Sequence, residues 1–177
     1  LKENNIQFEI NDRQILEGKE LDLYMPDKNF AIEFNGLYWH SEKFKSKKDH
    51  QEKTIKCREN NIQLFHIFAD EWRDKQKIVK SMILQRVGNI KKRKPARKCK
   101  VEIKSNNEIK EFFDENHISG HSKASIIFAL IIEGEIVSAL SLRKSWNKKY
   151  ENMIEICRFA SKLNTSIMGG FSKLMKY

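Results

Sequence analysis

Three polar residues on two neighbouring runs of the chain have the types and spacing needed for metal chemistry. Asp22 lies in one alternating run, and Glu33 and Asn35 lie in the next. Because side chains alternate between the faces of a strand, we expect Asp22 to share a face with Glu33 and Asn35. Two carboxylates held together against apolar strands are costly unless a cation joins them, and a hard divalent ion, Mg²⁺ or Mn²⁺, suits oxygen ligands. The alternative is an ordinary surface hairpin in which Glu33 faces solvent.

The elements that would position these residues form an α/β unit. Residues 21–24 and 30–35 read as adjacent strands because Met25-Pro26-Asp27-Lys28-Asn29 has turn chemistry. Hydrophobic periodicity extends this pattern along the chain. The expected strands are 6–10, 13–16, 21–24, 30–35 and 62–68, and the expected helices are 44–60 and 71–87. The pattern predicts a mixed sheet flanked by helices.

A second unit is expected after a basic segment, so the predicted domains are 1–90 and 99–177. Residues 91–98 hold six cationic side chains and Pro95, which predicts a linker. The second unit reads as a small α+β domain, with a hairpin turn at Glu133-Gly134. Its expected strands are 101–103, 125–132, 135–142 and 153–159, and its expected helices are 107–116 and 171–177.

Composition indicates what the chain binds. Lys and Arg total 34 against 24 Asp and Glu, which gives a net charge of +10 and a pI near 9.5. A chain this basic favours a polyanionic partner, and phosphate backbones are the commonest. No apolar run has the length of a membrane span, no signal peptide is visible, and three scattered cysteines fit a reducing cytoplasm.

Two histidines and a lysine follow the hairpin and could move protons. His40 comes soon after the carboxylates, and His50 and Lys53 lie three apart on the next expected helix. A neutral imidazole could activate water, whereas an imidazolium or an ammonium could protonate a leaving oxygen. Lys53 is also one of many lysines on that helix, so a purely solvated role is the alternative.

The spacing of Asp22, Glu33 and Asn35 resembles the PD-(D/E)XK nuclease core, with Asn35 where that group usually has Lys. The runs ELDLYMP…FAIEFNGLYWHSE and DHQEKTIKCRENNIQLFHIFADEW also resemble the very-short-patch-repair-like (Vsr-like) endonucleases, over roughly residues 13–75. Within that family they are closest to the EDxHD homing endonucleases seen in bacteriophages. This resemblance implies a metal-dependent DNA endonuclease with a PD-(D/E)XK-related fold.

The resemblance also implies roles for individual residues. Asp22 matches the metal-binding Asp, Phe34 falls where the repair enzymes offer a backbone carbonyl to the metal, and His40 matches the catalytic His. His50 stands at the position of the family's final acid. Glu33 is a ligand under the PD-(D/E)XK alignment and only a neighbour under the repair-enzyme alignment. The family's leading Glu has no counterpart, so a homodimer or a segment preceding residue 1 is expected to complete the site.

DNA contact is expected from two basic segments, because each cation that reaches a phosphate releases counterions. The expected contact residues are Lys43, Lys45, Lys47, Lys48, Lys91, Lys92, Arg93, Lys94, Arg97 and Lys98. In the second unit, the segment RFASKLNTSIMGGFSKLMKY loosely resembles part of a GNAT-like acyltransferase domain of phage proteins. There Gly169-Gly170 would be a phosphate-cradling loop, or simply a helix start that needs close backbone approach.

Three functions are therefore kept open. The first is a metal-dependent endonuclease of the homing type, acting in the host cytoplasm if it is phage-encoded. The second is a DNA-binding module with a degenerate nuclease core that recognises DNA without cutting it. The third is an acyltransferase-like protein that modifies nucleic acids.

Overall fold

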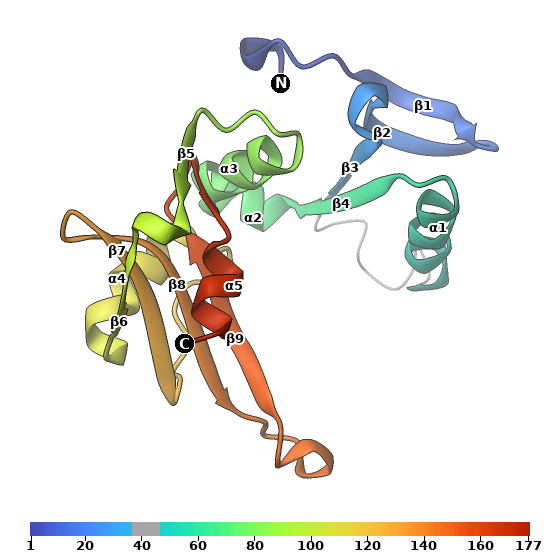
Figure 1. The fold of residues 1–177 in the computed structure, drawn as a ribbon. Coiled ribbons are helices and arrows are strands. Elements are labelled where there is room, and N and C mark those ends of the chain that lie inside the picture. Colours follow the sequence, from blue (N-terminus) through green and yellow to red (C-terminus); the bar gives the residue numbers. More distant parts are fainter. Residues whose placement is uncertain (37–46) are drawn as a thin grey trace. The chain divides into compact units, whose positions relative to one another are not determined.

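The computed structural model describes residues 1–36 and 47–177, and the side chains of 1–36 and 51–177. It divides into two compact units, Leu1–Val79 and Lys80–Tyr177 (Figure 1). Both units combine sheets with helices, which confirms the expected α/β class. The helix α3 (Gln76–Arg86) spans the boundary between the units. Within the described ranges, no helix is long and apolar enough to cross a membrane.

Unit 1 is built on a mixed four-stranded sheet. Its strands are β1 (Glu9–Leu16), β2 (Lys19–Met25), β3 (Phe30–Asn35) and β4 (Gln63–Phe68), in that order across the sheet. The pairs β1–β2 and β2–β3 are antiparallel, whereas β3 and β4 are parallel. A parallel pair needs a crossover, and α1 (Lys47–Glu59) lies in it. The mixed sheet expected from the sequence is confirmed.

The hairpin that carries the candidate site forms where turn chemistry predicts it. A 3₁₀ turn at Pro26–Lys28 begins with the proline and ends at Asn29, whose φ of 45° is left-handed. Pairing across the hairpin joins Met25 to Phe30 and Leu23 to Ile32. Beneath the sheet lies a core cluster of Leu16, Leu21, Tyr24, Ala31, Cys57 and Ile62.

Two sequence predictions in unit 1 differ from the structure. The two short strands expected at 6–10 and 13–16 are a single strand, β1, with an irregularity between Asp12 and Leu16. The single helix expected at 71–87 is two helices, α2 (Ala69–Asp74) and α3, separated at Lys75. Periodicity alone did not reveal either, because a bulge or a one-residue break leaves the apolar pattern nearly unchanged.

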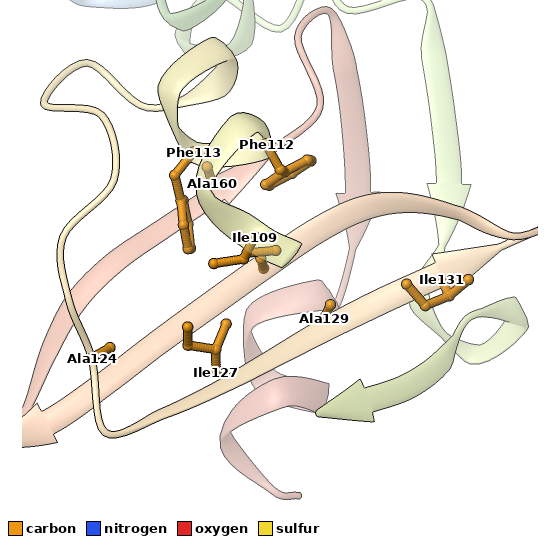
Figure 2. Packing of buried hydrophobic residues seen from close by; sticks show 9 residues of the cluster. Ile109, Phe112, Phe113, Ala124, Ile127, Ala129, Ile131 and Ala160 are labelled. Carbon is orange, nitrogen blue, oxygen red and sulfur yellow. The ribbon is translucent and has the colours of Figure 1, made fainter. Parts of the chain in front are cut away.

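Unit 2 contains an antiparallel sheet covered on both faces. The strand order is β6 (Lys100–Ile103), β7 (Ile126–Ile132), β8 (Glu135–Lys144) and β9 (Ile154–Ser161). Alternate residues of β7 enter two different cores, one with α4 (Asn106–Asn116) and the other with α5 (Gly170–Met175). Figure 2 shows the α4 side, where Ile109, Phe112 and Phe113 lie over Ile127 and Ala129. Burial on both faces explains the continuous apolar run of β7.

Residues 91–98, expected to form a basic linker, lie inside unit 2. Lys92–Pro95 forms β5, which pairs in parallel with β10 (Thr165–Met168), and a 3₁₀ turn follows at Ala96–Lys98. The division between units falls earlier, at Val79–Lys80. Composition suggested a linker because the segment is charged, but its backbone pairs with a strand about seventy residues further on, which local sequence does not indicate.

Candidate active site

The Asp22 carboxylate lies beside the backbone of Phe34. The amide N–H of Phe34 donates to Oδ2 of Asp22 at 2.7 Å. The regular pairing of β2 with β3 extends as far as Leu23 with Ile32. Beyond this residue pair, a backbone N–H of β3 donates to the side chain of Asp22 on β2. This hydrogen bond fixes the carboxylate at the end of the ladder, and within the described residues its other oxygen, Oδ1, accepts no hydrogen bond.

The direction of this hydrogen bond also locates the Phe34 carbonyl. In a strand, the N–H and the C=O of one residue point toward the same neighbouring strand. Because the Phe34 N–H points toward Asp22 on β2, the Phe34 carbonyl is directed to that same side of β3. A carboxylate and a carbonyl at one edge are hard oxygen donors that suit Mg²⁺. Asp22 and Phe34 therefore fit a divalent metal.

Glu33 has a different partner. Its Oε2 binds the Nζ of Lys53 on α1, and the two residues are only 4% and 8% exposed. The buried carboxylate thus has its cation, but that cation is an ammonium supplied twenty residues further along the chain. Burial raises the pKa of the Cys57 thiol; the nearby Lys53 ammonium opposes this and the Glu33 carboxylate adds to it. On α1, the side chains of Lys53 and Cys57 are buried, whereas that of Ile55 is largely exposed.

His66 lies in the same region, although the sequence alone did not predict it as a site residue. Glu33 and His66 are register partners in the parallel pair β3–β4. The Nδ1 of His66 lies 3.2 Å from Nδ2 of Asn35, and its Nε2 lies 3.4 Å from the Thr54 hydroxyl. The alternation of residues 62–68 could have identified His66 as a polar position on an expected strand. Nothing in the sequence alone pairs the two strands.

The remaining site predictions of unit 1 lie outside the described residues. Residues 37–46 include His40, Lys43 and Lys45, and the side chains of Lys47, Lys48 and His50 are likewise not described. In the described part of the chain, no three His, Cys, Asp or Glu side chains lie close enough to hold a metal ion together. Of the predicted metal donors, Asp22 and the Phe34 backbone lie side by side in this part.

The predicted DNA contacts in 91–98 differ among themselves. Lys91, Lys92, Arg97 and Lys98 are exposed, as phosphate contacts require. Arg93 is exposed as well, but its guanidinium donates to the carbonyl oxygens of Gly88 at 3.0 Å and Ile90 at 3.3 Å, which holds the turn before β5. Lys94 is partly buried.

The chemistry-bearing residues of unit 2 have structural partners. His117 accepts from the Ser119 N–H at Nδ1, and His121 Nε2 lies 3.2 Å from Asn106 Oδ1. Gly169 has a left-handed φ of 73°, and a Cβ on Gly170 would meet Ile167 at 3.1 Å. The left-handed backbone thus accounts for Gly169 and close packing for Gly170, as in the simpler of the two interpretations of the pair.

Comparisons with known proteins give one structural likeness. The chain is similar to the catalytic domain of the homing endonuclease I-Bth0305I, with 28% sequence identity and a TM-score of 0.41, over 51% of this chain and 88% of that chain. No protein-family model matches the chain. No curated protein matches it either.

Proposed function

We propose that this chain is a metal-dependent DNA endonuclease of the homing type, which hydrolyses phosphodiester bonds with Mg²⁺ or Mn²⁺. The observation that carries this proposal is the hydrogen bond from the Phe34 N–H to the Asp22 carboxylate. It joins the two residues that match the metal-binding positions of the repair-endonuclease-like motif. Two oxygen donors at a strand edge are suited to a hard cation.

Asp22 and the Phe34 carbonyl would hold the metal ion, which would polarise the scissile phosphate and stabilise the charge on its oxygens. The Phe34 N–H orients the Asp22 carboxylate before any metal binds, because it restrains the side chain through Oδ2. Oδ1 is left for coordination. A ligand fixed in advance loses less conformational entropy on binding.

Glu33 and Lys53 are assigned to positioning in this proposal, not to metal binding or proton transfer. Their buried ion pair joins β3 to α1, the helix that carries His50 three residues before Lys53. Proton transfer to or from the reacting oxygens is assigned to His40 or His50. The substrate is double-stranded DNA, and the three free cysteines are in keeping with action in a reducing cytoplasm.

Cleavage of supercoiled plasmid that carries randomised inserts tests the proposal, since nicking gives open circles and double-strand cleavage gives linear product. Asp22→Asn keeps an acceptor for the Phe34 N–H but removes the ligand charge, so we expect at least about a 100-fold loss of cleavage. Asp27→Asn removes an exposed carboxylate from the same hairpin and serves as the matched control. His40→Ala and His50→Ala identify the proton carrier.

Calorimetry of Mg²⁺ and Mn²⁺ binding gives a readout independent of cleavage. The wild-type protein and Asp27→Asn should bind the metal, and Asp22→Asn should bind it at least about tenfold more weakly. The proposal is wrong if Asp22→Asn cuts DNA as fast as the wild type. It is equally wrong if the wild type does not cut and its metal affinity is the same as that of Asp22→Asn.

A non-cleaving DNA-binding module is the second candidate, and one observation favours it. Glu33 is neutralised by Lys53, and Asn35, which stands at the usual Lys position, lies against His66. A core whose acid is already paired can keep its fold without chemistry. In that case the protein binds duplex DNA with the same affinity with and without Mg²⁺, and no variant changes cleavage because none occurs.

A further inference from the structure

The net positive charge of the chain comes from unit 2. Residues 80–177 contain 20 Lys and Arg against 9 Asp and Glu, whereas residues 1–79 contain 14 against 15. Favourable interaction with a polyanion follows the local excess of cations, so it falls to unit 2 and not to the unit with Asp22. Four of the ten DNA contacts predicted from the sequence, lysines 43, 45, 47 and 48, belong instead to unit 1.

One part of unit 2 combines exposed cations with exposed aromatic residues. Strand β7 pairs with β8 only as far as Leu142, whereas β8 and β9 remain paired to Lys144 and Ile154. The two strands thus continue as a two-stranded ribbon past β7, and a 3₁₀ turn at Lys148–Tyr150 lies at its tip (Figure 1). We call residues 143–156 the β8–β9 ribbon.

The apolar side chains of the β8–β9 ribbon are unusually exposed. Trp146 is 81% exposed, Ile154 70%, Met153 59% and Tyr150 41%. A cluster of large apolar side chains in solvent marks an interaction site more often than a folding requirement. Since β9 is an edge strand of its sheet, no further strand of the described structure covers this side.

Cations alternate with these aromatic residues. Lys144, Lys148 and Lys149 are exposed and form no ion pair within the part of the chain that the structure describes. The Arg143 guanidinium lies 4.4 Å from the Trp146 ring centroid, and the Lys149 ammonium lies 5.4 Å from that of Tyr150.

The turn is held in place by polar contacts of its own. Glu155 accepts from Arg143 Nε at 3.1 Å and from the Ser145 hydroxyl at 2.6 Å. Asn147 Oδ1 accepts from the Lys149 N–H at 2.9 Å. These bonds order the segment around Trp146 before any partner binds, which lowers the entropy cost of binding.

We propose that the β8–β9 ribbon is a DNA-contacting element that enters a groove of the duplex. The major groove admits a two-stranded ribbon, the exposed lysines match flanking phosphates, and Trp146 and Tyr150 meet sugars and base edges. Charge complementarity favours a polyanionic partner, since the exposed apolar residues are bordered by three exposed lysines that form no ion pair with another described residue. The choice of DNA as the polyanion rests on the proposed endonuclease function.

Fluorescence anisotropy with labelled duplex DNA, without divalent metal and in the Asp22→Asn background, tests binding apart from cleavage. Lys148→Ala with Lys149→Ala should weaken binding about tenfold or more and reduce the slope of log K against log salt by about two. Lys123→Ala with Lys176→Ala removes two exposed lysines of the same unit elsewhere and should leave the slope nearly unchanged. Trp146→Ala should weaken binding with the salt slope intact.

Three results would overturn the assignment. The first is equal weakening by the ribbon variant and the control variant, which would mean that only overall charge matters. The second is unchanged binding by Trp146→Ala together with unchanged thermal unfolding. The third is ribbon-dependent binding to phosphatidylserine vesicles without binding to DNA, which would identify a membrane surface. If the ribbon variants lose DNA affinity while the wild type never cuts, the ribbon assignment holds and the endonuclease proposal fails.

Discussion

The ammonium of Lys53 and the carboxylate of Glu33 form a buried ion pair between α1 and β3. Removing one partner of such a pair leaves an uncompensated charge, whereas removing both leaves an apolar contact. The pair therefore contributes little net stability, but breaking it carries a large free-energy penalty, and this penalty holds α1 against the sheet. This asymmetry can be measured with single and double variants.

Lys53→Met is expected to lower the free energy of unfolding by about 3–5 kcal/mol, because Glu33 stays buried without its cation. Glu33→Leu combined with Lys53→Met should recover most of this loss, because the buried pair is then replaced by an apolar contact. Urea unfolding followed by circular dichroism gives the values. Arg58→Met, which removes an exposed cation from α1, should change stability by no more than about 0.5 kcal/mol. A double variant less stable than Lys53→Met would contradict this account.

His66→Leu tests the polar contacts of β4. The change leaves the Asn35 amide and the Thr54 hydroxyl without the imidazole that lies beside each of them. We expect a loss of about 1–3 kcal/mol in the free energy of unfolding, because the Asn35 amide and the Thr54 hydroxyl each lose a hydrogen-bond partner. Gln63→Leu makes a comparable change at an exposed position of β4. Equal effects of the two substitutions would show that the His66 contacts contribute nothing.

His117 should make the stability of unit 2 depend on pH. Burial lowers the pKa of His117, and the nearby Arg158 cation lowers it further. Between that lowered value and the pKa of an unfolded histidine, about 6.5, the unfolded chain binds more protons than the folded one. The free energy of unfolding therefore falls as the pH drops through this window.

Urea unfolding at about pH 7.5 and at about pH 5.5, above and below the pKa of an unfolded histidine, measures the change expected for His117. His117→Asn should reduce the difference in stability between the two conditions. Carboxylates whose pKa is lowered, such as Glu108 beside Ser105 and Asp114 beside the His121 N–H, act only at lower pH. An unchanged difference in the variant would exclude His117 as the source.

Gly170→Ala should destabilise unit 2. The new Cβ would lie 3.1 Å and 3.2 Å from two carbons of Ile167 and 3.4 Å from Leu130, and both neighbours are buried. Overpacking of this kind costs about 1–3 kcal/mol, which exceeds the gain of up to about 1 kcal/mol from replacing glycine in a helix. Ser172→Ala, at an exposed position of α5, is the control. A rise in the melting temperature of Gly170→Ala would show that Ile167 moves aside.

Local sequence determined the elements around the candidate site. The turn residues 25–29 and the alternation on either side predicted β2 and β3, and β3 begins and ends as predicted, at Phe30 and Asn35. Glu133-Gly134 likewise predicted the β7–β8 hairpin, whose turn residues have φ values of 53° and 79°. Turn chemistry and periodicity act over a few residues, so they can be read from the chain directly.

Tertiary structure decided which polar groups meet. The sequence predicted a metal ion beside Glu33, but the fold places the ammonium of Lys53 on α1 there. The parallel pairing of β4 with β3 brings His66 beside Asn35. The same holds for the pairing of β5 with β10, which turns an expected linker into a strand. Long-range pairing depends on how whole elements pack, and no local pattern records it. The sequence, through the family resemblance, named Asp22 and the Phe34 backbone as candidate ligands, and only the fold shows the Phe34 N–H bound to the Asp22 carboxylate.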